Sequence, residues 1–446
     1  TPGIEPLWLL LDTPDQPALN GALDGFARAA ALEQGQRQWL RLQLLPAAER
    51  GQSINDLSAS VPWGQVQALA AAELALGWDG RQLHRQRVRP LLPERFRFAT
   101  RSFGLLESLE AAPLSAAAAS AGPGPGELEL AVEATGLNFR DVLNALGLLR
   151  AYSRQLGLDE AAQVPFGGEC VGTVTAVGPG VDPALVGRSL LAALAVGSLA
   201  SHVISRAELC VPLPAALSAA EGASLSTAFL TAIHGLQTLA KLQPGETVLI
   251  HAAAGGVGQA AVQVARRLGA RILATASAAK QQALLDQGVE AVFDSRSTAF
   301  ADQLLAATGG RGVDVVLNSL KGEWVDASFR ALAPGGRFVE LGKIEIWSRA
   351  DAQQRRPDAP YLPFDLLEVA AAEPQLVRGL LEQLLLDLQS GAYQPIPLQV
   401  FPEAQTQEAF RLMAQARHVG KLVIQRGEQA PPLRWRSDGT YLLSGG

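Results

Sequence analysis

The chain has 446 residues, of which 48% are hydrophobic and 18% charged, a composition that excludes a largely disordered protein and allows two or three domains. The formal net charge of −6 gives no electrostatic reason to expect nucleic acid or an anionic membrane as a partner. Only two cysteines occur, so neither a disulfide framework nor a cysteine-rich zinc module can form, and we expect a cytoplasmic protein. Apolar runs end well before the roughly 18 residues of a membrane span, so we expect no membrane insertion.

Residues 1–95 alternate between strand-like and helix-like patterns, which predicts a small α/β unit. The expected strands are residues 6–11, 39–45 and 82–89, and the expected helices are residues 18–34 and 63–76. No phosphate-binding glycine pattern occurs in this unit, so a structural role is favoured. Residues 439–446 are typical of a strand followed by the opening of a glycine-rich turn. We therefore expect the natural polypeptide to continue beyond this chain.

The composition changes twice along the rest of the chain. Residues 111–126 are rich in Ala, Pro and Gly and predict a linker, whereas residues 127–211 hold the short β-branched runs of a β-rich domain. Helices and strands then alternate, starting with a helix over residues 228–240 and continuing to about residue 342. The final section predicts a helix over residues 380–390, a strand over 393–401, a helix over 404–416 and a strand over 421–425.

A dinucleotide-binding pattern lies near the start of the alternating region. Residues 246–251 predict a buried strand, residues 259–268 a helix and residues 271–275 a second strand, which is the βαβ arrangement of a nucleotide-binding domain. The loop between them follows G-x-G-x-x-G with Ala in place of the first Gly. Its small residues let a pyrophosphate approach the helix N-terminus, which attracts anions. The expected cofactor-binding residues of this loop are Ala253, Gly255, Gly256, Val257 and Gly258.

The choice between NADH and NADPH depends on the residues that follow the second and third strands. An NAD site usually carries Asp or Glu at the end of the second strand, but here Ser277 and Lys280 follow it and no carboxylate is available. Arg296 follows the expected third strand, whose carboxyl end lies beside the second. Two cations and a hydroxyl favour the 2′-phosphate of NADPH. The alternative is that both cations are ordinary surface charges.

Four segments carry a family resemblance: residues 136–141 (GLNFRD), 252–258, 313–320 and 334–343. On these motifs, residues 97–425 resemble the medium-chain dehydrogenase/reductase superfamily and, more narrowly, the enoyl reductase domains of modular polyketide synthases and animal-type fatty acid synthases. The resemblance implies an α/β protein with a GroES-like domain over residues 97–225 and 345–427 and a Rossmann NADPH-binding domain over residues 226–344. Residues 1–95 are similar to the truncated structural half of a ketoreductase, and residues 428–446 to the start of its catalytic half.

Zinc-dependent alcohol dehydrogenases of this superfamily hold their catalytic metal with a Cys after the second strand and a His in a Gly-His-Glu turn. The matching positions here are Asn138 and Gly168, so both ligands are missing and we expect a reaction without metal. Cys170 and Cys210 lie in apolar strand-like runs and are expected in the core. Asn138 and Asp141 are expected to fix the cofactor side of the active site.

The resemblance implies hydride transfer from NADPH to Cβ of a trans-2-enoyl thioester on an acyl carrier protein, followed by protonation at Cα. Lys343, at the end of an expected strand, is the first candidate proton donor and Asp365 the second, with a structural ion pair as the alternative. Thr231 and Asn318 are expected to contact the nicotinamide half of the cofactor. Neighbouring ketoreductase and dehydratase domains of the same polypeptide are the other expected partners.

The sequence leaves the stereochemistry of protonation and two alternative functions open. Many relatives carry a tyrosine, linked to the stereochemistry of protonation, at the position of Leu149, and the nearest tyrosine here is Tyr152. A free-standing quinone or alkenal reductase is one alternative function, which the ketoreductase-like flanks disfavour. A catalytically inactive structural insert is another, which the intact glycine loop disfavours. Among the histidines, His251 ends the first Rossmann strand and is expected to be structural.

Overall fold

A computed structural model describes residues 95–114 and 122–427 in full, together with four strands of the N-terminal segment. The chain divides into two compact units, which are Thr1–Leu91 with Gln429–Gly446, and Leu92–Glu428. The helix expected over residues 18–34 and the start of a ketoreductase half expected over residues 428–446 lie outside the described residues.

The first unit contains a four-stranded sheet of the order β1-β2-β3-β4. Its strands are β1 (Trp8–Asp12), β2 (Trp39–Leu44), β3 (Ala75–Trp78) and β4 (Leu83–Arg85). The first three strands are parallel and β4 is antiparallel to β3, which agrees with a small α/β unit. The prediction of a helix over residues 63–76 is wrong at its C-terminal end, where β3 begins. Ala75 and Leu76 pair with β2 there, because sheet pairing overrides their helix propensity.

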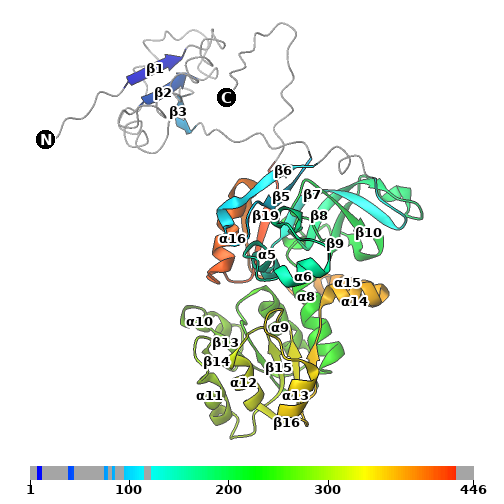
Figure 1. Ribbon diagram of the computed structural model, residues 1–446, viewed down its shortest axis with the longest axis vertical. Helices are drawn as coiled ribbons and strands as arrows, with labels where there is room; N and C mark the ends of the chain where they lie inside the picture. Colours follow the sequence, from blue (N-terminus) through cyan, green and yellow to red (C-terminus); the bar gives the residue numbers. More distant parts are fainter. Residues whose placement is uncertain are drawn as a thin grey trace, which may run out of the picture. The chain divides into compact units, whose positions relative to one another are not determined.

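The β-rich part of the second unit is built on a seven-stranded sheet (Figure 1). Its order is β11-β9-β8-β7-β19-β18, with β10 paired to β7 off this path. The strands are β7 (Glu127–Gly136), β8 (Glu169–Val177), β9 (Ser189–Ala193), β10 (His202–Arg206), β11 (Cys210–Pro212), β18 (Leu398–Pro402) and β19 (Lys421–Gln425). β18 and β19 come from the C-terminal section, so the last part of the described chain completes the sheet that its middle begins.

A hairpin and three helices accompany this sheet. The hairpin consists of β5 (Phe96–Thr100) and β6 (Leu109–Pro113), and the helices are α5 (Phe139–Ala145), α6 (Arg150–Gln155) and α16 (Thr406–Ala414). Ala111 and Ala112 were predicted to begin a linker, but they pair with β5, so backbone hydrogen bonding outweighs their composition. Phe96, Phe166 and Phe410 fill the core that these elements share.

The other part of the second unit is a doubly wound domain with the predicted parallel sheet, of the order β14-β13-β12-β15-β16-β17 (Figure 1). Its strands are β12 (Thr247–Ile250), β13 (Arg271–Ala276), β14 (Ala291–Asp294), β15 (Val313–Asn318), β16 (Leu332–Glu340) and β17 (Tyr361–Pro363). Its helices are α9 (Gly256–Arg267), α10 (Ala278–Asp286), α11 (Phe300–Ala307), α12 (Glu323–Arg330) and α13 (Arg349–Arg355). The strand order reverses beside β12, and such sheets bind ligands at the carboxyl ends of the strands.

The doubly wound domain extends farther along the chain than the sequence predicted. The GroES-like domain was expected to resume at residue 345, but β17 pairs in parallel with β16, so the sheet continues to Pro363. A strand as short as YLP carries too little periodicity to be recognised from sequence. After it, α14 (Leu366–Ala372) and α15 (Pro374–Gln389) lead back toward β18.

One apolar core joins the two sheets. Helix α7 (Ala219–Gly222) is followed by α8 (Ser226–Ile233), which continues into a π-helical segment, His234–Leu239. The core contains residues of α8, α9 and α15 together with residues of both sheets, including Val171, Val248 and Leu381. In the part of the chain that the structure describes, no helix combines the length and the apolarity needed to cross a membrane.

Candidate active site

The loop between β12 and α9 has the geometry of a dinucleotide-binding turn. Gly255 is the N-cap of α9 and has no side chain to occupy the N–H groups of the first turn, where Val257 lies. A Cβ at Gly258 would lie 2.5 Å from Cα of Ala253, whereas a Cβ at Gly255 would meet only the carbonyl oxygen of Ala252, at 3.4 Å. Gly258 is therefore required for close packing of α9, and Gly255 leaves room for a pyrophosphate.

Gly256 is small for a different reason, since Lys421 of β19 lies directly against it. A Cβ at Gly256 would be 2.6 Å from Cδ of Lys421. Beside this contact, Gly255 and Gly420 form an isolated parallel bridge, and the N–H of Gly420 donates to the carbonyl of Ala254 at 2.8 Å. The glycine loop of the doubly wound domain therefore rests on the β19 end of the GroES-like domain.

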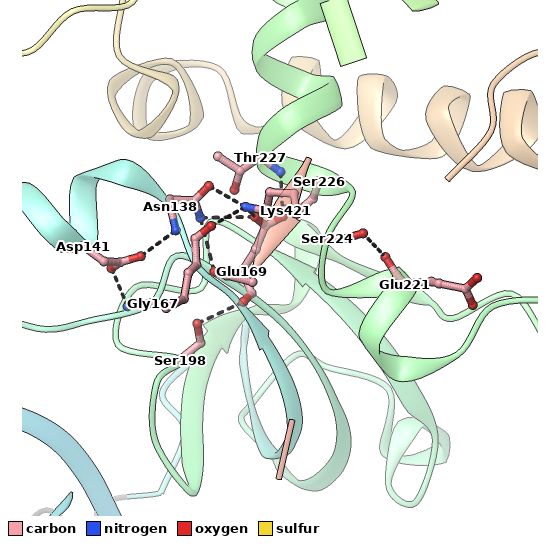
Figure 2. A network of polar contacts seen from close by, with 12 residues as sticks. Asn138, Asp141, Gly167, Glu169, Ser198, Glu221, Ser224, Ser226, Thr227 and Lys421 are labelled. Carbon is pink, nitrogen blue, oxygen red and sulfur yellow. Dashed lines mark hydrogen bonds and ion pairs between the residues drawn. The ribbon is translucent and has the colours of Figure 1, made fainter. Parts of the chain in front are cut away.

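Lys421 forms a buried ion pair with Glu169 (Figure 2). The distance from Nζ to Oε1 is 2.5 Å, and the two side chains are 4% and 0% exposed. The ammonium also donates to the carbonyl of Leu137 at 2.8 Å and to Oδ1 of Asn138 at 2.7 Å. It thus has a partner for each of its three protons, which is what a charge needs when it is removed from water.

The carboxylate of Glu169 is equally well satisfied. Its Oε2 accepts from the hydroxyl of Ser226 and from the N–H of Thr227, each at 2.8 Å. Its Oε1 accepts from the side-chain amide of Asn138 at 3.1 Å, in addition to Lys421. This buried network (Figure 2) ties β8 and β19 to the start of α8 and to the loop after β7.

Asp141 holds the loop that carries Asn138. One of its oxygens accepts from the backbone N–H of Asn138 at 2.8 Å and the other from the N–H of Gly167 at 2.7 Å. Burial raises the pKa of Asp141, although these two N–H donors oppose the rise. Both residues predicted for the cofactor side thus belong to the network beneath the glycine loop. Direct contact between Asn138 and the cofactor remains a prediction.

The same network lies where zinc-dependent members of the superfamily are expected to hold their metal. The side chains there are an amide from Asn138, a carboxylate from Glu169 and an ammonium from Lys421, while Gly168 has no side chain to offer. A buried ammonium repels a divalent cation and the carboxylate is already engaged, so these residues do not fit zinc. The described ranges also contain no group of three or more His, Cys, Asp or Glu residues that could hold a metal ion.

The thiols and His251 have structural surroundings. Cys170 and Cys210 are buried in one apolar cluster, and burial raises the pKa of both thiols. His251 is buried, with Nδ1 2.9 Å from the hydroxyl of Thr275 and Nε2 2.8 Å from that of Ser328. Burial lowers the pKa of His251 to about 3, so the ring is neutral near pH 7.

The candidate proton donors lie close together just beyond the ends of β16 and β17. Nζ of Lys343 is 3.1 Å from Oδ2 of Asp365 and also donates to the carbonyl of Phe364 at 3.1 Å. Arg140 of α5, which the sequence did not single out, approaches the same Oδ2 at 2.9 Å. Burial tends to raise the pKa of Asp365, but the charges of Lys343 and Arg140 prevail and lower it. Asp365 is therefore a carboxylate that holds the cations and has no proton to give, so Lys343 is the remaining candidate donor of the predicted pair.

Asn318 and Glu340 end β15 and β16 on the same edge of the sheet. The amide of Asn318 donates to both carboxyl oxygens of Glu340, at 3.0 and 2.8 Å, and to the carbonyl of Leu320 at 2.9 Å. Burial raises the pKa of Glu340 to about 7, although its hydrogen bonds and the charge of Lys343 oppose the rise. The amide of Asn318 is thus committed to this carboxyl group. Its predicted nicotinamide contact, and that of the half-buried Thr231 in α8, remain predictions.

The residues predicted to select NADPH follow β13 and β14 at this edge. Ser277 is the N-cap of α10, and Arg296 is exposed after β14. The ammonium of Lys280 donates to the carbonyl oxygens of Ala416 at 2.7 Å and His418 at 2.6 Å, in the loop between α16 and β19. Its partial desolvation lowers the pKa of Lys280. The sequence predicted that these residues follow the second and third strands of the sheet, but it gave no indication that Lys280 bonds to this loop.

The sequence also missed Glu169, Lys421 and Arg140 as site residues. A weak signal existed for Lys421, because a charged residue opens the otherwise apolar strand KLVIQ. Glu169 likewise opens the mostly apolar strand ECVGTVTAV. No local pattern could pair them, since they lie 252 positions apart in the chain.

Two known families match parts of the chain. Residues 124–215 match the family described as alcohol dehydrogenase GroES-like domain, and residues 287–424 match the family described as zinc-binding dehydrogenase. A phenolphthiocerol/phthiocerol polyketide synthase of Mycobacterium tuberculosis is 44% identical over 331 residues, which cover 72% of this chain. The match covers only 15% of that much longer protein.

Solved structures match the second unit over their whole length. The CurK enoyl reductase is 44% identical, with a TM-score of 0.71, and the match covers 75% of this chain and 100% of that chain. The CurF ER cyclopropanase from the curacin A biosynthetic pathway is 40% identical, with a TM-score of 0.70 and the same coverage. The quinone oxidoreductase of Escherichia coli, solved with NADPH, is 25% identical, with a TM-score of 0.66, 74% of this chain covered and 99% of that chain.

Loss of one member of the buried ion pair should destabilise the second unit strongly. We expect Lys421→Met to lower the free energy of unfolding by about 3–5 kcal/mol, because it leaves the Glu169 carboxylate buried without its counter-charge. The double variant Lys421→Met/Glu169→Gln should recover part of the loss. Urea unfolding measures both, and Lys321→Ala, which breaks an exposed pair with Glu345, is the control, with an expected loss below about 1 kcal/mol. Equal losses for Lys421→Met and Lys321→Ala would contradict the assignment.

Chelation should leave the turnover rate unchanged, because Asn138, Glu169 and Lys421 do not form a zinc site. The measurement is turnover after dialysis against a strong chelator, with elemental analysis of the same preparation. Stoichiometric zinc in active protein, together with a loss of turnover on chelation, would overturn this prediction.

Proposed function

The chain belongs to the polyketide synthase enoyl reductases of the medium-chain dehydrogenase/reductase superfamily, and we propose that it reduces a trans-2-enoyl thioester with NADPH. One observation carries the proposal. The glycine loop after β12 and the Lys343–Asp365 pair beyond β16 and β17 lie at the carboxyl edge of one parallel sheet. A dinucleotide held at that edge and a proton donor beside it are the two requirements of this reduction.

The proposed chemistry needs no metal. NADPH, when bound, supplies a hydride, which is a proton with two electrons, to Cβ of the substrate and is itself oxidised to NADP⁺. The π electrons of the C=C bond then pass to the thioester as an enolate, whose negative charge the carbonyl oxygen shares. Lys343 gives a proton from Nζ to Cα, which completes the saturated thioester, and recovers its proton from water. Asp365 keeps the ammonium in place, because its oxygen lies 3.1 Å from Nζ.

The cofactor would be bound by several parts of this edge. The free N–H groups at the start of α9 would receive the pyrophosphate, and the room beside Gly255 fits that role. Ser277, Lys280 and Arg296 would surround the 2′-phosphate of NADPH, since they follow the neighbouring strands β13 and β14. Among the solved relatives, the E. coli quinone oxidoreductase was obtained with NADPH, which supports this choice of cofactor.

The proposed substrate is carried by an acyl carrier protein through its phosphopantetheine arm. The curated relatives are multidomain synthases, and the chain spans a small share of their length, as the 15% coverage of the M. tuberculosis protein illustrates. We propose that residues 1–95 are the structural half of a ketoreductase whose catalytic half begins at residues 428–446. Ketoreductase and dehydratase domains would then be neighbours in the same polypeptide.

Two other reactions can be tested in the same assay. A quinone reductase is supported only by relatives of lower identity, 25% for the E. coli enzyme against 44% for CurK. A relative named as a cyclopropanase is 40% identical, so overall similarity alone does not separate ring closure from reduction. Mass analysis of the product from a trans-2-enoyl thioester with a leaving group at Cγ, compared with quinone turnover, distinguishes the three reactions. A product without two added hydrogens would refute the proposed reduction.

NADPH selectivity should depend on Lys280 and Arg296. Charge-assisted hydrogen bonds contribute roughly 1.5–3 kcal/mol each, so Lys280→Ala/Arg296→Ala should raise the KM for NADPH at least about tenfold and change that for NADH little. Initial rates with both cofactors check this, with Arg330→Ala, an exposed arginine at the end of α12, as the control. Equal use of NADPH and NADH by the unmodified protein would show that these residues do not select the cofactor.

Proton donation by Lys343 can be separated from a purely structural ion pair. Lys343→Ala should lower kcat by about a hundredfold, because a positioned general acid contributes about 10² to 10⁴ in rate. Lys343→Arg is the matched control: it keeps the charge beside Asp365, but a guanidinium does not readily give up a proton, so kcat should stay low. Single-turnover rates at saturating NADPH measure both variants. Full activity of Lys343→Arg would favour the structural ion pair.

A further inference from the structure

Asp365 is shared by two cations. Its Oδ2 lies 3.1 Å from Nζ of Lys343 and 2.9 Å from Nη1 of Arg140. Its other oxygen, Oδ1, accepts from the N–H of Leu367 at 2.9 Å, because Asp365 is the N-cap of α14. All three charged side chains are largely shielded, with 29%, 27% and 11% of the Lys343, Arg140 and Asp365 side chains exposed. The carboxylate therefore has a fixed position between the two cations.

The two cations come from different domains. Lys343 follows β16 of the doubly wound sheet, whereas Arg140 lies on α5 of the GroES-like part. α5 is itself fixed by the buried network, because its first turn contains Asp141, which binds the backbone N–H groups of Asn138 and Gly167. The fixed position of α5 thus holds Arg140 beside the proposed proton donor.

The guanidinium of Arg140 has a second contact that orients it. The ring of Tyr152 on α6 lies beneath it, with 5.0 Å between the guanidinium carbon and the ring centroid. A planar guanidinium stacked on an aromatic ring and bonded to a carboxylate has little freedom left. Leu149, at the position where the family resemblance implies a tyrosine, is buried at the start of α6. Tyr152 therefore brings an aromatic side chain to the Arg140 side of the pair.

We infer that Arg140 is a positioning residue for proton transfer, acting through Asp365 on Lys343; the inference rests on the proposed role of Lys343 as donor. Arg140 and Lys343 hold the same oxygen of Asp365, Oδ2. Without Arg140, the carboxylate could turn toward Lys343 and draw its ammonium away from the substrate. An error of about 1 Å in the placement of a reacting group can lower a rate about a hundredfold. Because Arg140 belongs to the GroES-like part, the proton donor is complete only when both domains are in place.

The test uses Arg140→Met, which keeps an unbranched apolar stem and removes the charged guanidinium. We expect kcat to fall about tenfold to a hundredfold at an unchanged KM for NADPH, because the residue acts on the proton step and not on the cofactor. Arg140→Lys should restore a large part of kcat. Arg154→Met, an exposed arginine on neighbouring α6, is the control and should behave like the unmodified protein. If thermal melting shows that Arg140→Met is unfolded, Arg140→Gln takes its place.

The route through Asp365 is tested by a double-mutant cycle. In an Asp365→Asn background, Arg140→Met should lower kcat little further, because the carboxylate through which it acts is gone. An equal fall in both backgrounds would overturn the inference, and so would a normal kcat for Arg140→Met when Lys343→Ala is strongly impaired. Normal kcat for Lys343→Ala itself would instead refute the proposed donor, and the inference with it. The two failures are therefore distinguishable.

Discussion

The buried ion pair between Lys421 and Glu169 is the interaction on which the rest of the site depends. Two charges removed from water are costly, and this pair is tolerated because hydrogen bonds satisfy all three ammonium protons and both carboxylate oxygens. The carbon chain of Lys421 also forms the surface against which Gly256 packs. The position of the glycine loop therefore follows from the position of a buried charge in the neighbouring sheet.

Cationic side chains connect the two parts of the second unit at three places. Lys421 supports the glycine loop, Arg140 reaches Asp365, and Lys280 binds the loop that contains Ala416 and His418. Each contact joins a residue of one domain to a residue of the other, and each lies at the carboxyl edge of the parallel sheet or directly beneath it. The contacts that hold the two domains together thus also position the proposed nucleotide-binding loop and the proposed proton donor.

The ion pair between Lys421 and Glu169, which lies where zinc-dependent members of the superfamily are expected to hold their metal, has a chemical consequence. A zinc ion polarises a carbonyl during hydride transfer, whereas an ammonium locked beneath the glycine loop cannot approach the substrate. An α,β-unsaturated thioester does not need such help, because its own carbonyl accepts the electrons that hydride addition displaces. The network of Asn138, Glu169 and Lys421 is therefore in keeping with an enoyl substrate.

The sequence by itself determined the features that rest on local chemistry. The glycine loop, the strands and the helix on either side of it, and the placement of Lys343 beyond the end of a strand all follow from short-range patterns, and the structure agrees with them. Only the tertiary structure decided that β17 belongs to the parallel sheet, that Lys421 meets Glu169, and that Arg140 shares Asp365 with Lys343. Periodicity reports which face of an element is buried, but a pairing between distant residues leaves no local pattern. Such a pairing arises only when the folded chain brings two separate elements together and a buried charge needs a counter-charge beside it.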